Sequence, residues 1–212
     1  MKKPYRLFYG GFIALGFAAL GLAPFSQTRA FASELCKNNY VFFDFGKTII
    51  DDSKFKWGPT MDKCTGTFSY VPGAFEYLNE LRTKGYKIGM LVNFPDQWGL
   101  DANGQPSTQV KIDNIKKIVA GDGHWDDPNP IQWDIFELGI FVPPRDENRK
   151  PKPYLFEQAE KLAKEAGCKA IYQGEELEEM KAARAAGMFP YQVARPGEEF
   201  FAPFLFLEQP HN

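Results

Sequence analysis

The chain has few of the residues that build zinc sites or disulfide networks. It holds three cysteines and two histidines among 212 residues. Cys36, Cys64 and Cys168 lie far apart in the sequence, and no CxxC or close Cys/His spacing occurs. Structural zinc sites depend on such spacings. The sequence therefore argues against a metal site built on cysteine.

The chain also lacks an excess of positive charge. Lys and Arg number 25 against 27 Asp and Glu, and the basic residues are scattered rather than gathered in a stripe. Proteins that bind nucleic acid usually carry a basic patch, so we expect no nucleic acid as a partner. No internal repeat occurs, and the 44% hydrophobic content suits one globular domain.

A long apolar run occurs near the amino terminus, from Leu7 to Ala23. Three basic residues precede it (Lys2, Lys3 and Arg6), and a polar stretch after it ends in an Ala-Phe-Ala segment. This order is typical of a secretory signal peptide. We predict a signal peptide at 1–32, cleavage after Ala32, and a mature domain at 33–212 that is periplasmic or secreted.

An uncleaved membrane anchor is the alternative interpretation, because the run approaches the ~17 to 25 residues of a spanning helix. Four glycines inside the run and the small residues after it favour cleavage. No stable membrane insertion is then expected. Residues 1–32 hold four of the 25 basic residues and none of the 27 acidic ones, which leaves a net charge of −6.

In an oxidising compartment the cysteines near the first strand could pair. Cys36 lies just before that strand and Cys64 in the loop region after it. We predict a Cys36–Cys64 disulfide that holds this loop, with Cys168 as the odd cysteine, buried at the start of a later strand.

Two kinds of apolar pattern alternate along the rest of the chain. Continuous apolar segments, typical of strands buried on both faces, occur at 39–50, 86–94, 133–142, 168–174 and 189–195. Apolar residues at helical spacing lie between them, at 72–85, 107–119, 150–167 and 175–187. The alternation predicts an α/β fold, a three-layer sandwich with a mainly parallel sheet. The apolar tail from Phe200 to Leu207 is expected to dock on the core.

The ends of the first two strands carry polar residues in a recognisable context. VFFDFGKTI places Asp44 and Thr48 after the first strand. GYKIGMLVN ends the second strand in Val92 and Asn93. In open α/β sheets, chemistry usually takes place at the carboxyl ends of the strands.

Two later segments complete a set of four. RKPKPYLFEQA contains Lys150, and YQGEELEEMKAARAAGM contains Glu175 and Glu179. In this order the four segments resemble the motifs of the haloacid dehalogenase (HAD) hydrolases, which read hhhhDxDxT, a Ser or Thr often followed by Asn, KPxPxxF and GDSxxDxxAAxxAGM. The resemblance covers Val41 to Met188 and implies a Rossmann-like fold.

The resemblance also implies a phosphatase mechanism on a small phosphorylated substrate. Asp44 would be the nucleophile, Lys150 would neutralise charge, and Asn93 and Thr48 would complete the site. Mg²⁺ would be held by Asp44, Gly46, Glu175 and Glu179. Only residues 51–70 separate the first strand from the next helical segment, so a small flap is expected instead of a large cap.

Three positions depart from the family pattern. Gly46 stands where the family has a second carboxylate, and loss of a general acid typically costs ~10² to 10⁴ in rate. Val92 replaces a hydroxyl donor, at a typical cost of ~10² to 10³. Glu175 keeps a carboxylate, but its extra methylene moves the oxygens, and Mg²⁺ tolerates poor geometry badly.

Simpler interpretations exist for each candidate. Lys150 could be a surface lysine beside Lys152, and Asp44 could cap a loop. The acidic residues at 175–179 could favour the first turn of a helix. Trp57 and Trp98 could form a binding platform or simply pack long loops on the core. A lone loop histidine such as His124 is usually solvated, so it is left out of the site.

Two functions follow from these observations. The first is an exported HAD-like phosphatase with weakened activity. The second is a catalytically inactive protein of the same fold that binds a phosphorylated ligand or a partner. Mg²⁺ binding through Asp44 and Glu175 would favour the first.

Overall fold

The computed structural model describes residues 39–121 and 123–193. The expected signal peptide and the apolar tail lie outside the described residues. Within the described part, no helix is long and apolar enough to cross a membrane.

A five-stranded sheet forms the centre of the molecule, with the strand order β7-β6-β1-β8-β9. Its strands are β1 (Tyr40–Phe43), β6 (Lys87–Leu91), β7 (Gly139–Phe141), β8 (Ala170–Gly174) and β9 (Phe189–Gln192). Every pairing in this sheet is parallel. The predicted α/β fold with a parallel sheet is confirmed, and β1 lies in the middle.

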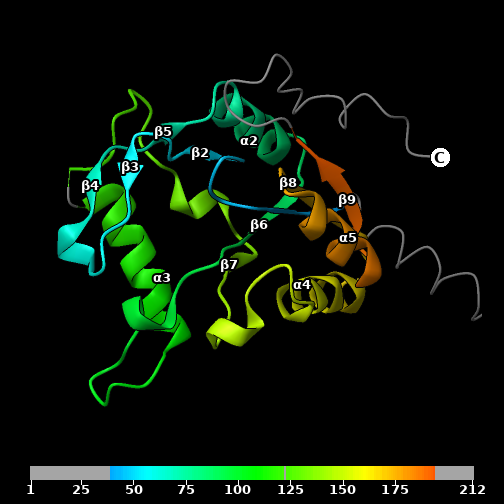
Figure 1. Cartoon of the computed structure of the whole chain (residues 1–212). Coiled ribbons are helices and arrows are strands. Elements are labelled where there is room, and N and C mark those ends of the chain that lie inside the picture. Colours follow the sequence, from blue (N-terminus) through cyan, green and yellow to red (C-terminus); the bar gives the residue numbers. More distant parts are fainter. Residues whose placement is uncertain (1–38, 122, 194–212) are drawn as a thin grey trace, which may run out of the picture.

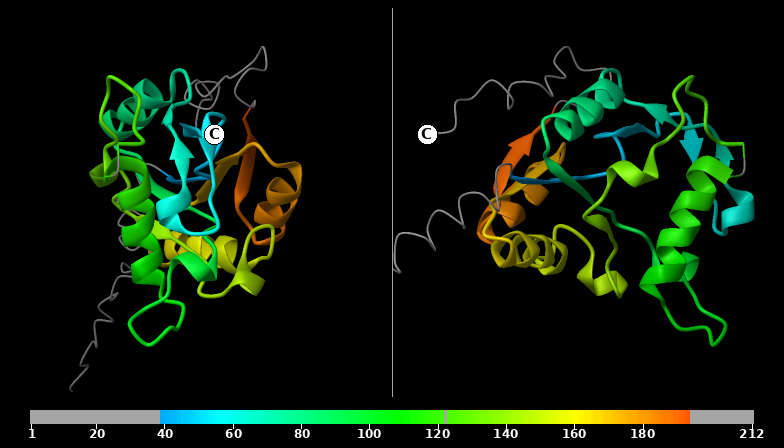
Figure 2. Two further views of the ribbon diagram at one scale, coloured as in Figure 1. Left: turned by 60° about the vertical axis from the view of Figure 1, so that its left-hand side comes forward. Right: turned by 180° about the vertical axis from the view of Figure 1, so that it is seen from behind.

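Helices cover both faces of the sheet (Figures 1 and 2). They are α2 (Ala74–Thr83), α3 (Thr108–Lys116), α4 (Tyr154–Glu165) and α5 (Leu177–Ala185). Alternate residues of β1 point to opposite faces, as strand geometry requires. Val41 and Phe43 pack with α2, whereas Phe42 packs with α4 and α5. These two clusters give the predicted three-layer sandwich.

The flap expected at 51–70 consists of two short antiparallel ribbons. β2 (Ile50–Asp51) pairs with β5 (Ser69–Tyr70), and β3 (Phe55–Lys56) pairs with β4 (Thr65–Gly66). The 124–127 segment holds the flap in place: Phe68 N–H donates to His124 O at 2.6 Å, and Tyr70 N–H donates to Asp127 Oδ2 at 3.1 Å. His124 therefore has a structural contact outside the pocket described below.

Two local predictions differ from the structure. The segment predicted as a third strand at 133–142 forms a strand only at Gly139–Phe141, because Trp133–Ile135 forms a 3-10 helix. The predicted Cys36–Cys64 disulfide is wrong, since Cys64 is a free buried thiol. Cys168 is disulfide-bonded instead of being the odd cysteine.

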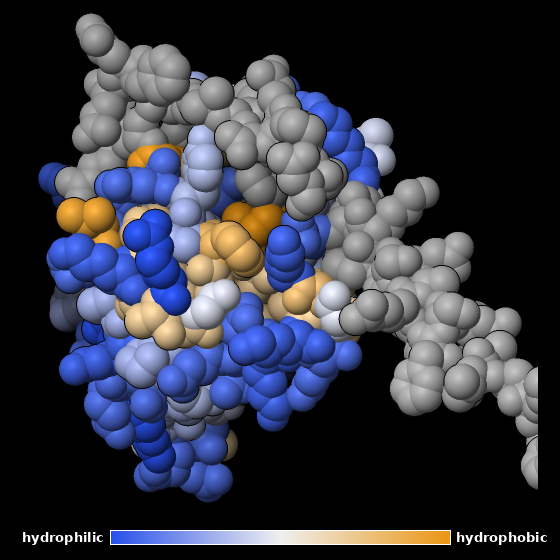
Figure 3. Space-filling view, turned by 90° about the vertical axis from the view of Figure 1, so that its right-hand side faces the viewer, coloured by the Kyte–Doolittle hydropathy of each residue, from blue (hydrophilic) through white to orange (hydrophobic). Residues whose placement is uncertain are grey.

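The edge of the molecule formed by α5 and β9 exposes some large apolar side chains. Figure 3 shows this side, with apolar patches among hydrophilic residues. Leu177 is 54% exposed and Phe189 is 56% exposed. Single exposed apolar residues of this kind are common on soluble proteins.

A buried lysine joins α3 to the loops around the pocket. Lys111 is fully buried, and its Nζ donates to Asp96 Oδ1 at 2.5 Å and to Pro143 O at 2.8 Å. Its stem lies against Gly99, where an added Cβ would come within 2.0 Å of the Lys111 Cγ. The glycine thus makes room for the lysine, and the lysine holds α3 beside the loop after β6.

We expect Lys111→Ala to lower the free energy of unfolding by about 3 kcal/mol, because it leaves the Asp96 carboxylate without its cation and creates a cavity. Urea unfolding measures the change. Lys116→Ala, on the exposed side of the same helix, is the control and should change stability by less than about 0.5 kcal/mol. Equal effects of the two substitutions would contradict this role of Lys111.

Candidate active site

Four polar residues meet because their strands are neighbours in the sheet. Asp44 follows β1, Asn93 follows β6, Lys150 lies in the loop after β7, and Glu175 follows β8. The strands are parallel, so their carboxyl ends lie at one edge of the sheet. The four segments thus converge at the edge of the sheet where they were predicted to lie.

Lys150 lies at the centre of the site. Its side chain is only 1% exposed, and its Nζ contacts the carboxylates of Asp44 and Glu179, the latter at 2.9 Å. Burial alone would lower the pKa of this ammonium, but the two carboxylates outweigh burial and raise the pKa above its ordinary value. The interpretation of Lys150 as a surface lysine is therefore wrong.

Tyr172 is a member of this cluster that we did not predict from the sequence. Its hydroxyl accepts a hydrogen bond from Lys150 Nζ at 3.0 Å and donates to Glu179 Oε2. Burial, with Asp44 and Glu179 nearby, raises the pKa of the phenol well above its ordinary value. The signal available in the sequence was a tyrosine in a fully buried strand, whose hydroxyl needs a partner.

Asn93 positions Lys150 through two backbone contacts. The Asn93 side chain donates to Lys150 O at 3.0 Å and accepts from Lys150 N–H at 2.7 Å. This pair joins the loop after β6 to the loop after β7. Because the amide bonds the backbone of Lys150, the structure assigns Asn93 a positioning role.

Thr48 and Glu175 form the other side of the site. Thr48 is buried, and its Oγ1 donates to Glu175 Oε2 at 3.1 Å. Burial raises the pKa of Glu175 to about 7, and the neighbouring carboxylate of Asp44 adds to this effect. Two carboxyl groups that face each other in this way favour a shared proton or a cation between them.

The loop after β1 brings these groups together by a tight turn. Ile49 N–H and Ile50 N–H both donate to Phe45 O, and Lys47 lies in the left-handed region with φ 56°. Gly46 precedes Lys47 in this turn. A Cβ added at Gly46 would lie 3.3 Å from Asp52 Oδ2, so a flap carboxylate occupies the space beside the glycine.

A cavity of about 630 Å³ opens above these residues. Its polar floor contains Asp44, Lys150 and Glu175, and the flap contributes Asp52. Burial raises the pKa of Asp52, although Lys47 partly opposes this shift. The cavity is therefore lined by several carboxyl groups together with the buried ammonium of Lys150.

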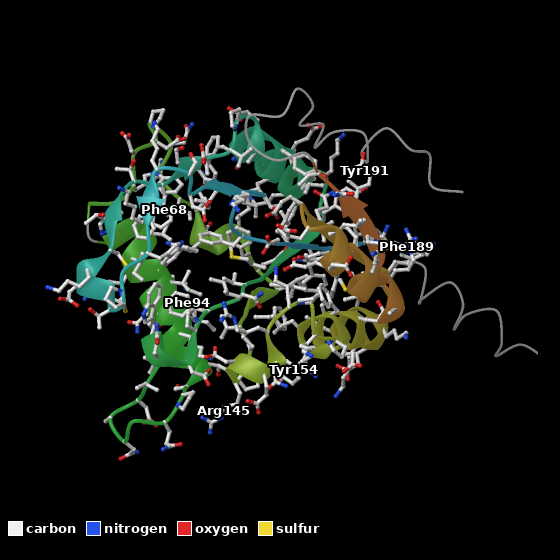
Figure 4. All side chains as sticks on the ribbon, viewed as in Figure 1. Phe68, Phe94, Arg145, Tyr154, Phe189 and Tyr191 are labelled. Carbon is white, nitrogen blue, oxygen red and sulfur yellow. The ribbon has the colours of Figure 1, made fainter. Side chains whose placement is uncertain are left out.

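The opposite wall of the cavity is apolar. It includes Trp57 and Phe68 from the flap, Phe94 and Trp98 from the loop after β6, and Ile118 after α3. Figure 4 shows Phe68 and Phe94 on the side of the molecule that carries α3, away from Phe189 on β9. The segment from Phe94 to Val119 thus contributes several residues to the cavity lining.

The four expected Mg²⁺ ligands lie near one another, but only three of them are placed to share a cation. Asp44 and Glu175 face each other, and Gly46 lines the same cavity. Glu179 instead bonds Lys150 and Tyr172. Among the described residues, no group of three or more His, Cys, Asp or Glu is arranged to hold a metal ion. The pair Asp44 and Glu175 fits a hard cation best, because burial and the charge of Asp44 both raise the pKa of Glu175, and a bound cation would offset both effects.

We expect Lys150→Met to lower the free energy of unfolding by about 3 to 5 kcal/mol, since two partly buried carboxylates would lose their cation. Lys152→Met is the matched control, because Lys152 is exposed in the same turn. Urea unfolding of the two variants measures the difference. Similar stabilities would contradict the central position of Lys150.

The raised pKa of Glu175 predicts a pH dependence of stability in the metal-free protein. The unfolded chain loses this proton near the ordinary pKa of 4.5, whereas the folded protein keeps it to about 7. The contribution of Glu175 therefore stabilises the fold at low pH and is lost as the pH rises through this window.

In EDTA, the free energy of unfolding should fall between about pH 5 and pH 8, and Glu175→Gln should make this fall smaller by about 2 kcal/mol. This value is less than the whole pKa shift would give, because solvent screens the group. Thermal unfolding at several pH values measures this. Glu176→Gln, at the exposed neighbouring position, should leave the profile of the unsubstituted protein unchanged. A Glu175→Gln profile that matches the unsubstituted one would refute the prediction.

Comparisons with known proteins gave matches among solved structures only. No protein-family model matches the chain, and no curated protein matches it. D,D-heptose 1.7-bisphosphate phosphatase from B. bronchiseptica, crystallised with magnesium and phosphate, is 17% identical, with a TM-score of 0.45; the match covers 74% of this chain and 80% of that chain.

Two further solved structures are similar. A haloacid dehalogenase-like hydrolase from Streptococcus pneumoniae is 15% identical, with a TM-score of 0.45 and coverage of 80% of this chain and 90% of that chain. CbbY from Rhodobacter sphaeroides, in complex with phosphate, is 13% identical, with a TM-score of 0.45 and coverage of 77% and 90%.

Proposed function

We propose that the chain is a phosphate-monoester phosphatase that uses Asp44 as its nucleophile. The observation that carries the proposal is the contact between Asp44 and the buried ammonium of Lys150 at the floor of a cavity. The ammonium of Lys150 lies beside the attacking carboxylate, and its positive charge attracts a phosphate to that carboxylate.

In the proposed reaction a carboxylate oxygen of Asp44 forms a bond to phosphorus while the bond from phosphorus to the ester oxygen breaks. Lys150 stabilises the negative charge that develops on the phosphoryl oxygens. Water then attacks the aspartyl phosphate and regenerates Asp44. Glu179 and Tyr172 hold Lys150 in place through the contacts described above.

We propose Mg²⁺ as the cofactor, held by Asp44, Glu175 and the backbone carbonyl of Gly46. When bound, this cation would supply charge neutralisation for the phosphoryl group. Thr48 fixes one oxygen of Glu175 and so orients its carboxylate. The extra methylene of glutamate, relative to aspartate, is consistent with weak metal binding and weakened activity.

A binding protein without catalysis is the second candidate. Gly46 has no side-chain acid, and the side chain of Val92 is buried and offers no hydrogen-bond donor. Both features would lower the rate without removing the cavity. Such a protein would bind a phosphorylated ligand through Lys150.

We further propose that the protein is exported. The amino-terminal pattern of basic, apolar and small residues supports this. The disulfide bond of Cys168 also supports it, because disulfides persist in oxidising compartments.

The mature protein, residues 33–212, should hydrolyse p-nitrophenyl phosphate in Mg²⁺. This ester tests the nucleophile because its leaving group needs little protonation. EDTA should reduce the rate by at least about 10-fold, and Asp44→Asn should reduce it by at least about 10³-fold. Release of nitrophenolate measures the rate.

Asp146→Asn, an exposed carboxylate outside the cavity, is the control and should retain the rate. Turnover that survives Asp44→Asn would refute Asp44 as the nucleophile. If there is no turnover but a phosphate ester binds, and Lys150→Met abolishes that binding, the second candidate holds.

A further inference from the structure

We propose that Asp52 of the flap acts as the general acid and base of the proposed reaction. This inference rests on the proposed function. It concerns the proton that an alcohol leaving group must receive, for which Gly46 offers no donor. The carboxyl group that could supply this proton comes from a different part of the chain.

The position of Asp52 carries the argument. Its Oδ2 lies 3.3 Å from the place where a Cβ on residue 46 would be. A carboxylate attached at residue 46 and the carboxylate of Asp52 would therefore occupy nearly the same region. Asp52 also lines the cavity together with Asp44, and it is half-buried.

The other carboxyl groups of the cavity floor have contacts of their own. Glu179 bonds Lys150 and Tyr172. Glu175 accepts the hydroxyl of Thr48 and faces Asp44. Asp52 comes from the flap and lines the same cavity, and Lys47 is a basic residue whose charge acts on its carboxyl group. It is therefore the carboxyl group best placed to meet the leaving oxygen.

The proton balance is complete with this residue. As the bond from Asp44 to phosphorus forms and the ester bond breaks, the carboxyl of Asp52 gives its proton to the leaving oxygen, and an alcohol departs. Asp52, now a carboxylate, takes a proton from the water that attacks the aspartyl phosphate. Inorganic phosphate leaves, Asp44 is restored as a carboxylate, and Asp52 is again protonated.

The experiment compares two esters that differ in their need for a proton donor. In the mature protein, Asp52→Asn should lower turnover of an alkyl ester, hexyl phosphate, by about 10² to 10³-fold, and that of p-nitrophenyl phosphate by less than about 10-fold. Asp51→Asn, the neighbouring carboxylate on β2, is the control and should change neither rate. Urea unfolding shows whether the variants are folded.

A second variant tests the position directly. Gly46→Asp combined with Asp52→Ala should turn over the alkyl ester at least about 10-fold faster than Asp52→Ala alone, because the new carboxylate reaches the vacated space. An equal loss on both esters, or no loss on either, would overturn the role of Asp52 while leaving the nucleophile intact. Aryl-ester turnover that is independent of Asp44 would instead overturn the proposed function.

A different observation supports a second inference, that the organic group of the substrate is a bulky apolar or aromatic one. The cavity wall opposite the polar floor is formed largely by apolar side chains. Trp57 and Trp98 lie with their ring centroids 5.1 Å apart, and Trp98 Nε1 donates to Pro59 O. The indole N–H of Trp98 is therefore used within the protein.

Such a wall selects against a hydroxyl-rich group. A sugar placed there would lose hydrogen bonds to water without replacing them, whereas an aromatic or branched apolar group would gain contacts. Trp57 is 46% exposed at the rim of the cavity, where a bound ring could cover it. The occupant is thus the alcohol portion of the phosphate monoester, held between the flap and the loop after β6.

Two aryl esters with similar leaving groups but different ring sizes test the contact between the organic group and the apolar wall. The ratio of kcat/KM for 1-naphthyl phosphate to that for phenyl phosphate should be about 10 or more, and Trp57→Ala should reduce the ratio about fivefold. Phe189→Ala, at an exposed aromatic on β9, is the control and should keep the ratio. A ratio near one, an unchanged ratio in Trp57→Ala, or a preference for glucose 6-phosphate would overturn the inference.

Binding gives the same comparison without turnover. Quenching of tryptophan fluorescence in the Asp44→Asn protein yields the Kd of each ester. The same preference for the naphthyl ester is expected there, and it would stand even if the protein were not a phosphatase.

Discussion

The ammonium of Lys150 is buried among carboxylates, and most of the site depends on this contact. A charge removed from water is costly unless it is paired and hydrogen-bonded. Asp44 and Glu179 supply the negative charges, and Tyr172 adds a hydroxyl contact. The loops after β1 and β7 and the start of α5 must therefore meet in one arrangement. The same contact fixes the carboxylate of Asp44 beside the ammonium at the floor of the cavity.

The parallel sheet makes this meeting possible. Strands β6, β1 and β8 are adjacent, so residues that are far apart in the sequence emerge at one edge. The flap then closes over that edge and contributes a carboxylate and an aromatic wall. The site thus combines a polar floor from the sheet with an apolar wall from the loops. This division suits a ligand with a charged end and an apolar end.

The sheet, its helices and the convergence of Asp44, Asn93 and Lys150 were predictable, because apolar periodicity and residues at strand ends are local signals. The contacts of Tyr172 and Asp52 were not, because they depend on how distant segments pack. The wrong disulfide had the same cause: the positions of Cys36 and Cys64 on either side of the first strand did not decide the pairing. Lys111 was missed because a buried lysine departs from the apolar pattern of its helix.

The most direct test of the account is to trap the covalent intermediate. The mature protein would be mixed with p-nitrophenyl phosphate and Mg²⁺, quenched in acid, reduced with borohydride and digested for mass spectrometry. The account predicts that Asp44 is converted to homoserine, the product of reducing an aspartyl phosphate, and that the peptide is unmodified without substrate. Turnover with modification at another residue, or with none at Asp44, would contradict it.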